Sequence, residues 1–151
     1  MIKTRKESNK VLYAKDSLIT VAQRDIKYLI KLAKKNPDKT IRLCTHKNKN
    51  DVLNEMIIIH PKKYKVKSHM HPRNAESMMI IKGRVDILIY NKRGKVIKTI
   101  EMGEFGSKKV FYYKIPKKTY HTLIIKSPFL IFYEVSKGKF SKSKNSYTDW
   151  R

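Results

Sequence analysis

Cysteine, acidic residues and long apolar runs are all scarce in this 151-residue chain. The single cysteine, Cys44, excludes an internal disulfide framework and fits a reducing cytoplasm, where we expect the protein to reside. The chain has no run of about eighteen apolar residues, and its polar N-terminus lacks the apolar segment of a signal peptide, so we expect no membrane insertion. The length predicts one domain whose core needs no covalent staples.

Acidic residues are outnumbered by basic ones, 12 against 36, which gives a formal net charge of +24. Such a charge raises the prospect of nucleic acid, an anionic membrane or phosphorylated substrates. The basic residues are spread along the chain, however, and no helix-turn-helix, paired zinc cysteines or aromatic RNP strand is present. We therefore expect no specific nucleic-acid partner. The charge reflects either AT-rich codon usage or a field that attracts an anionic small molecule, such as a sugar derivative linked to a nucleotide.

The chain divides into a helical N-terminal part and a β-rich remainder. Thr20 and Gln23 resemble a capping box, and apolar residues follow at helical spacing as far as Asn36-Pro37-Asp38, which predicts one amphipathic helix at about 21–35. Alternating or continuous apolar segments predict strands at 41–46, 55–59, 64–70, 77–81, 85–90, 96–100, 110–115, 121–125 and 129–135. Many short strands separated by turns indicate an antiparallel sandwich or barrel, not a parallel βαβ fold.

These patterns predict three parts: an N-terminal extension at 1–39, a β-barrel at 40–136 and a tail at 137–151. A short apolar segment at 11–13 predicts a strand that docks on a sheet edge. The tail is polar but contains Tyr147 and Trp150. These aromatic residues predict that the tail folds back onto the barrel, or onto the partner subunit of a homodimer.

His69, His71, Glu76 and His121 are the candidate metal ligands. Alternate residues of a strand point to the same face, so the first two imidazoles lie side by side. Glu76 would face away on an unbroken strand, and a turn or bulge at Pro72-Arg73-Asn74 is needed to bring its carboxylate back. His121 adds a third imidazole from a later strand. This mixed nitrogen and oxygen set suits one divalent transition metal, either Fe, Zn, Mn or Ni, with positions left open for substrate, water or dioxygen.

Three further residues are candidates to surround this site, each with an ordinary structural alternative. His46 can act as a general base near neutral pH, or be a partly buried histidine bonded to the backbone. Tyr120 can orient a substrate, or pack at the rim of the barrel. Glu134 is unusual in an apolar strand; it either accepts a hydrogen bond from the free N–H of a ligand histidine or faces solvent on an edge strand.

The spacing of the ligands resembles the two motifs of the cupin superfamily. The first motif, G-x5-H-x-H-x3-4-E-x6-G, is matched through Gly83, although Lys63 stands where it opens with glycine. The second motif, G-x5-P-x-G-x2-H-x3-N, keeps Pro116 and His121. Its glycines and its asparagine are replaced by Val110, Lys118 and Ile125. The resemblance implies a single jelly-roll-like antiparallel β-barrel that holds a metal, preceded here by one N-terminal helix.

The order of elements is more specifically similar to the WbuC family of cupin-fold metalloproteins, in the segments 42–46, 54–58, 69–72, 120–122 and 133–135. That resemblance implies a role in bacterial surface-polysaccharide (O-antigen-type) synthesis. We expect a metal-dependent enzyme that acts on a sugar or nucleotide sugar by isomerisation or a related proton transfer, with His46 or Tyr120 moving the proton. The alternatives are a non-catalytic metal- or sugar-binding cupin and a ferrous-iron oxygenase of a small organic substrate.

Overall fold

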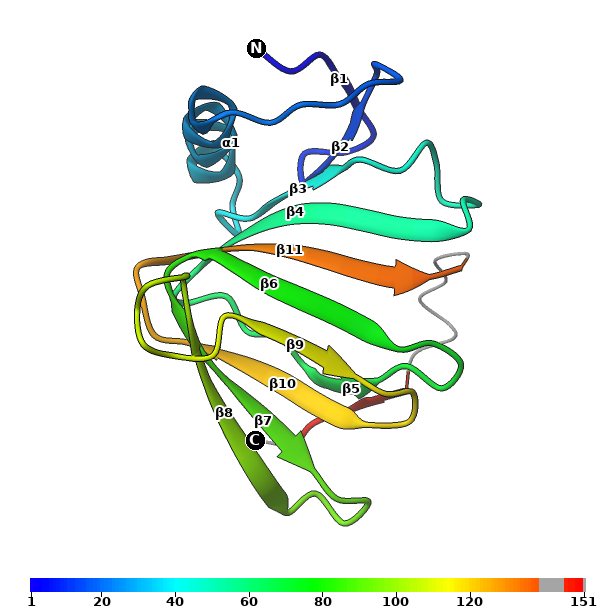
Figure 1. Ribbon diagram of the computed structural model, residues 1–151, viewed down its shortest axis with the longest axis vertical. Helices are drawn as coiled ribbons and strands as arrows, with labels where there is room; N and C mark the ends of the chain where they lie inside the picture. Colours follow the sequence, from blue (N-terminus) through cyan, green and yellow to red (C-terminus); the bar gives the residue numbers. More distant parts are fainter. Residues whose placement is uncertain (139–145, 151) are drawn as a thin grey trace.

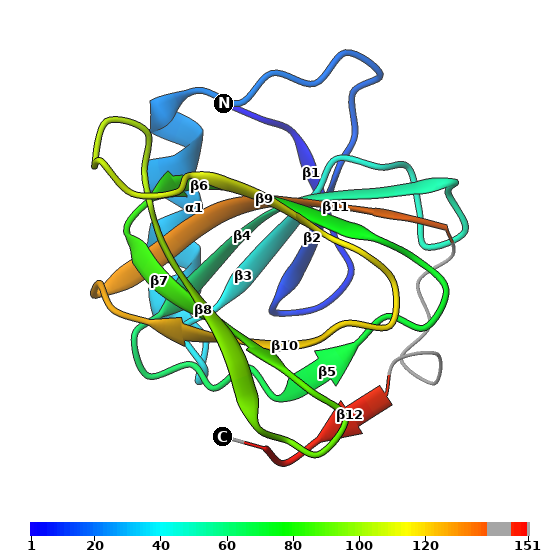
Figure 2. The same cartoon turned by 60° about the horizontal axis from the view of Figure 1, so that its bottom comes forward.

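The computed structural model describes residues 1–138 and 146–150. Within these residues the chain forms two facing β-sheets with an apolar core between them, and one helix that packs on the outer side of the larger sheet (Figures 1 and 2). This architecture confirms the prediction of a mostly β fold with a single N-terminal helix. No helix in the described part of the chain combines the length and apolarity that crossing a bilayer requires.

The strands of the two sheets come from widely separated parts of the described sequence. The larger sheet has the order β1-β2-β3-β4-β11-β6-β9, with β1 (Thr4–Lys6), β2 (Val11–Ala14), β3 (Ile41–Cys44), β4 (Leu53–Pro61), β11 (Phe129–Lys137), β6 (Glu76–Lys82) and β9 (Tyr112–Ile115). The smaller sheet has the order β12-β5-β10-β7-β8, with β12 (Ser146–Thr148), β5 (Ser68–Met70), β10 (Tyr120–Ile125), β7 (Arg84–Tyr90) and β8 (Val96–Gly103). Neighbouring strands are antiparallel except for β2 and β3, which are parallel.

Helix α1 (Gln23–Lys35) begins later than the sequence pattern predicts. Its N-cap is Ala22, whose backbone N–H donates to the Asp25 carboxylate over 2.9 Å. The same carboxylate accepts a 2.7 Å hydrogen bond from the backbone N–H of Ile2, so it also ties the N-terminus to the helix. These two backbone donors hold the pKa of Asp25 below its usual value. The predicted capping box at Thr20 and Gln23 is therefore wrong: the helix begins at Gln23, so Thr20 lies two residues before the N-cap and Gln23 is the first helical residue.

The helix covers one face of the larger sheet because strand β3 alternates. Ile41 and Leu43 point outwards into a cluster with Leu29 and Ala33 of α1. The intervening residues Arg42 and Cys44 must point to the opposite, inner face. That inner face meets the smaller sheet and forms the main core, with fully buried residues such as Ile58, Met78, Phe132, Val85 and Ile87.

Both ends of the described chain join the sheets. Strand β2 extends the larger sheet beyond β3, which confirms the predicted docking of segment 11–13 on a sheet edge. Strand β12 pairs with β5 on the side opposite to β10. The ring of Trp150 lies 4.8 Å from that of Tyr120, and Gly94 approaches it so closely that a Cβ there would lie 2.9 Å from the indole. The tail aromatics thus pack on the barrel; segment 139–145 of the tail lies outside the described residues.

One predicted strand is shorter than expected. Segment 64–70 alternates in sequence, but only Ser68–Met70 is a strand, and residues 64–67 have no regular structure. Tyr64 instead stacks on the ring of His60 at 4.0 Å, and a cross-strand partner is absent for this segment among the described residues. Alternation alone does not make a strand where the tertiary fold offers no neighbour to pair with.

Replacing Trp150 by alanine tests whether the tail supports β5. We expect the free energy of unfolding to fall by about 2 kcal/mol, less than for a fully buried tryptophan, because the half-buried indole loses its contacts with Tyr120 and Gly94. Amide hydrogen exchange in β5 should become faster. Urea unfolding and hydrogen exchange measure both effects. Asp149→Ala is the control, since that side chain is 92% exposed; equal midpoints for all three proteins would contradict the role of the tail.

Candidate metal centre

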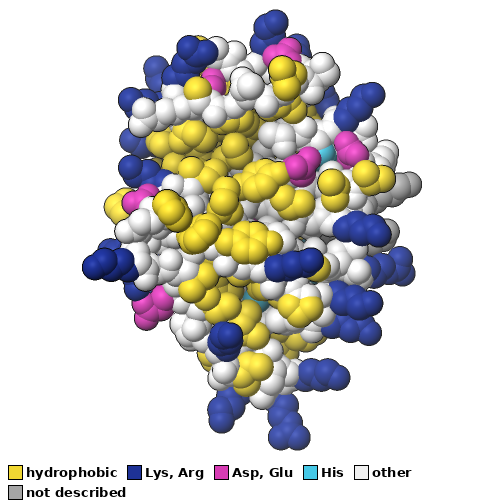
Figure 3. Space-filling view, in the orientation of Figure 1, with side chains coloured by type: hydrophobic (Ala, Val, Ile, Leu, Met, Phe, Trp, Pro, Cys, Tyr) yellow, Lys and Arg dark blue, Asp and Glu magenta, His cyan; other side chains and the backbone are white. Residues whose placement is uncertain are grey.

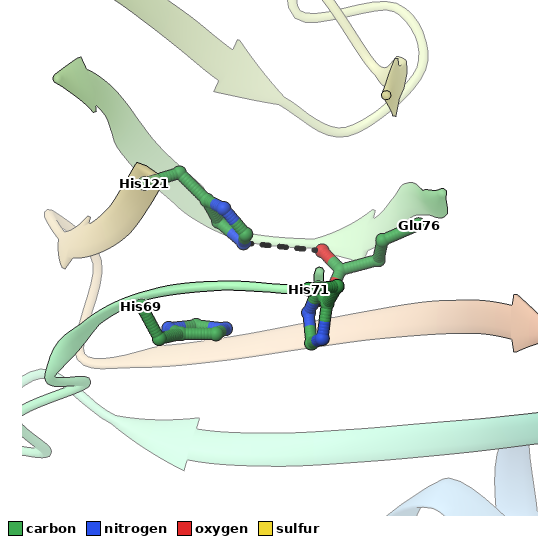
Figure 4. A group of neighbouring side chains, drawn as sticks. All are labelled: His69, His71, Glu76 and His121. Carbon is green, nitrogen blue, oxygen red and sulfur yellow. Dashed lines mark hydrogen bonds and ion pairs between the residues drawn. The ribbon is translucent and has the colours of Figure 1, made fainter. Parts of the chain in front are cut away.

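The two sheets bring the four predicted ligands together (Figure 4). His69 in β5 is the cross-strand partner of His121 in β10, which places their rings 4.4 Å apart. His71 directly follows β5. Glu76 opens β6 in the opposite sheet, so Pro72–Ala75 carry the chain from one sheet to the other. The predicted turn is therefore a crossing between the layers, and the carboxylate faces the imidazoles across the interior.

The ligand atoms of these four residues all lie within 4.8 Å of one another. His71 Nε2 is 2.8 Å from Glu76 Oε2, and His121 Nε2 is 3.7 Å from Glu76 Oε1. Around one ion with bonds of about 2.1 Å, adjacent ligands of an octahedron are about 3.0 Å apart and opposite ligands about 4.2 Å apart. The observed spread is close to this geometry.

Backbone carbonyls orient two of the three imidazoles. Nδ1 of His69 lies 2.8 Å from the Lys67 carbonyl, and Nδ1 of His121 lies 3.0 Å from the Thr119 carbonyl. A carbonyl only accepts, so Nδ1 donates in both rings and Nε2 of each imidazole is left to face the cluster. Burial and the neighbouring His121 lower the pKa of His69 to about 4, so this ring is neutral at pH 7.

Glu76 is an ionised carboxylate inside the protein, with an exposed fraction of 3%. Burial alone would favour its neutral form, but the neighbouring imidazoles of His121 and His71 hold its pKa well below the usual value. The hydroxyl of buried Tyr113 donates to Oε1 over 2.6 Å and fixes the carboxylate's orientation. Burial and the charge of Glu76 raise the pKa of Tyr113 well above its usual range, so this tyrosine remains a donor.

The cluster fits a divalent metal ion. Nε2 of His121 is buried and has no hydrogen-bond partner among the described residues, which is costly unless something binds its lone pair. The buried negative charge of Glu76 likewise calls for a nearby cation. A divalent ion held by three imidazole nitrogens and one carboxylate oxygen would answer both needs. The hydrogen bonds from His69 and His121 to backbone carbonyls are those that commonly orient metal-bound histidines.

The four ligands line a cavity of about 540 Å³, a volume suited to a small organic molecule. Its wall also contains apolar side chains of the core and several basic residues. Glu134 faces the same cavity from β11. Burial and the nearby charge of Glu76 raise the pKa of Glu134 to about 7, although Arg42 opposes that shift.

The structure does not bring all the predicted functional residues to this cavity. His46 is buried elsewhere: its Nδ1 accepts from the backbone N–H of Glu55 over 3.0 Å, and its ring meets Tyr13 edge-on. Tyr120 packs against Trp150. Neither residue lines the cavity. Glu134 does, but the acceptors found for His69 and His121 are backbone carbonyls, so the predicted roles of these three residues stay predictions.

Tyr113 and Arg42 were missed in the sequence. Tyr113 holds Glu76, and Arg42 lines the cavity. The signal for Arg42 was the alternation of Ile41-Arg42-Leu43-Cys44, which places a charge on the same face as a buried cysteine. Tyr113 gave no such signal, because its contact with Glu76 depends on the pairing of β9 with β6.

A family model described as "Domain of unknown function (DUF6016)" matches residues 21–102, more than half of the chain. The chain belongs to the DUF6016 family. The matched segment contains α1 and three of the four candidate ligands, His69, His71 and Glu76, whereas His121 lies beyond it. No curated protein resembles this member of the DUF6016 family closely enough in sequence to be counted as a match.

Solved structures with a similar fold include two oxalate decarboxylases and CapF. Oxalate decarboxylase from Bacillus subtilis at pH 4.6 has a TM-score of 0.52 and 17% identity, over 65% of this chain and 24% of the enzyme. The Lactobacillus farciminis oxalate decarboxylase formate complex has a TM-score of 0.51 and 17% identity, over 64% of this chain and 27% of that enzyme. CapF with the inhibitor 3-isopropenyl-tropolone has a TM-score of 0.59 and 14% identity, over 76% of this chain and 33% of CapF. The DUF6016 chain thus spans about a quarter to a third of these proteins and shares a cupin-like fold with them. The Bacillus subtilis decarboxylase has Mn(II) centres.

Tyr113→Phe tests how the carboxylate ligand is held. Loss of the 2.6 Å hydrogen bond frees Glu76 Oε1 to rotate, so we expect affinity for Mn²⁺ or Zn²⁺ to fall by about tenfold while the fold is kept. Tyr112→Phe is the matched control, because the neighbouring Tyr112 is exposed and its hydroxyl donates to the Ser77 hydroxyl at 3.2 Å, away from Glu76. Competition with a chelator of known affinity measures the difference; equal affinities in both variants would refute the role of Tyr113.

Proposed function

We propose that the protein is a metal-dependent enzyme that acts on a sugar or nucleotide sugar by isomerisation or a related proton transfer. The observation that carries this proposal is the convergence of His69, His71, Glu76 and His121 within 4.8 Å on the wall of a cavity large enough for a small molecule. A divalent transition metal bound there, either Fe, Zn, Mn or Ni, would supply a Lewis acid for a carbonyl or hydroxyl oxygen of the substrate.

We assign the proton-carrying role to Glu134. Its position supports this role: it faces the cavity from β11, where its cross-strand partner in β6 is Met78, two residues beyond Glu76. The carboxylate therefore lies on the same inner face as the candidate ligand without belonging to the ligand set. From there its oxygens can accept a proton from a bound substrate and return it to a neighbouring atom. His46 and Tyr120, the residues expected from the sequence, do not line the cavity.

We further propose kinship with the WbuC family and a place in bacterial surface-polysaccharide synthesis in the cytoplasm. The support is the order of elements in the sequence, including Tyr120 directly before His121, and the shared cupin-like architecture. A homodimer stays a prediction as well, and the packing of Trp150 on Tyr120 leaves the tail without an evident need for a partner subunit.

The charges on the face shown in Figure 3 and around the cavity favour a small anionic substrate over nucleic acid. On the face shown in Figure 3, Lys and Arg side chains lie mostly around the outline, with hydrophobic side chains in the middle. This differs from the continuous basic stripe that typically follows a nucleic-acid backbone. Basic residues do reach the cavity, where Lys10, Arg42, Lys65 and Lys67 contribute to the lining. The positive field therefore favours entry of an anionic sugar derivative.

Exchange of substrate protons with solvent tests this proposal. Metal-loaded protein is incubated in D₂O with a panel of nucleotide sugars, and proton NMR follows each carbon-bound hydrogen. We expect deuterium incorporation or isomer formation for at least one compound, with loss of the effect in Glu134→Gln. Binding without exchange by any member of the panel would instead favour a non-catalytic binding cupin, and consumption of dioxygen by the ferrous form would favour an oxygenase.

A further inference from the structure

Arg42 is a charged residue on the inner, mainly apolar face of the larger sheet. Its side chain lines the cavity that contains the candidate ligands. The cross-strand partners of Arg42 are Val11 in β2 and Ile58 in β4. Ile58 in turn pairs with Phe132 in the next strand, β11. These neighbours are apolar, so the strand pairing provides no acid to balance the guanidinium.

Among the described residues, the guanidinium has no partner from elsewhere either. Arg42 is half-buried, and its Nε is fully buried with no hydrogen-bond partner in that part of the chain. Glu134 and His60 are near enough for Arg42 to lower the pKa of each. Neither forms a salt bridge or hydrogen bond with it, and no other described residue does so. An arginine placed among apolar side chains normally has a carboxylate partner, because desolvating the charge is costly.

We propose that Arg42 binds a carboxylate or phosphate group of the small molecule that occupies the cavity beside the metal site. The guanidinium is a planar fork of N–H donors whose geometry matches both oxyanions and binds them through two parallel hydrogen bonds. This inference rests on the proposed function, because the same cavity contains the candidate metal ligands. It adds that the substrate carries a carboxylate or phosphate group.

The other cations of the cavity do not take this role. Lys10 is already paired with the Asp38 carboxylate, and Lys67 lies 3.5 Å from Asp149 at the exposed edge. Lys65 is exposed. Within the part of the chain that the structure describes, Arg42 is therefore the cavity cation that is partly buried and unpaired, and a charge-assisted hydrogen bond is stronger there than in water. The lysines add a positive field at the mouth and raise the rate of entry.

Binding of simple oxyanions to the full chain tests this assignment. Inorganic phosphate and malonate are titrated calorimetrically into the protein as purified and after chelator treatment, at constant ionic strength. We expect saturable binding of at least one of the two oxyanions by the wild type. Comparing the phosphate titration with the malonate titration distinguishes a phosphate site from a carboxylate site. Arg42→Gln should weaken that binding by at least about tenfold, and Arg42→Lys by less, because lysine keeps the charge but not the fork.

Arg93→Gln is the matched control, since it removes the same charge from an exposed turn; its affinity should equal that of the wild type. Thermal unfolding of Arg42→Met adds a second readout: without oxyanion its midpoint should equal or exceed that of the wild type, and added phosphate or malonate should stabilise only the wild type. No saturable binding by the wild type, equal affinity in Arg42→Gln, or a destabilised Arg42→Met with unchanged oxyanion binding would overturn the assignment. Metal content measured in each sample separates this result from the metal site, because loss of oxyanion binding with full metal content concerns Arg42 alone.

Discussion

The facing of two sheets is the constraint on which the candidate site depends. His69 and His121 meet as cross-strand partners in the smaller sheet, whereas Glu76 belongs to the larger one. The carboxylate and the imidazoles can therefore meet only when the apolar inner faces close on each other. Burial of core residues such as Phe132 and Ile87 thus supplies the free energy that holds four polar groups in one place.

The interior that results contains several polar and charged groups beside its apolar core. An ionised Glu76, an unsatisfied Nε2 on His121 and an unpaired Arg42 all face one cavity. Each costs folding free energy, because buried polar groups without partners lose their hydration. A divalent cation and an oxyanion would satisfy all three groups together. The proposed function therefore rests on a match: the fold leaves these polar groups without partners, and a metal ion and an anionic substrate would provide the partners.

Much of the architecture could be predicted from sequence, because short β-rich apolar segments bounded by turn residues are typical of strands. Segments such as 85–90 and 129–135 were found in this way, and motif spacing indicated the four candidate ligands. Contacts between distant strands could not be predicted. The hydrogen bond from Tyr113 to Glu76 depends on the register of β9 against β6, and β12 carries no apolar pattern of its own. His46 was selected for its chemistry, but the fold places it away from the cavity lining.

X-ray absorption spectroscopy of the protein after addition of one equivalent of Mn²⁺ or Zn²⁺ tests the central claim most directly. We expect one ion per chain, with imidazole and carboxylate ligands together at about 2.0–2.2 Å and the multiple-scattering signature of three histidines. A spectrum of a fully hydrated ion, or one without imidazole scattering, would contradict it.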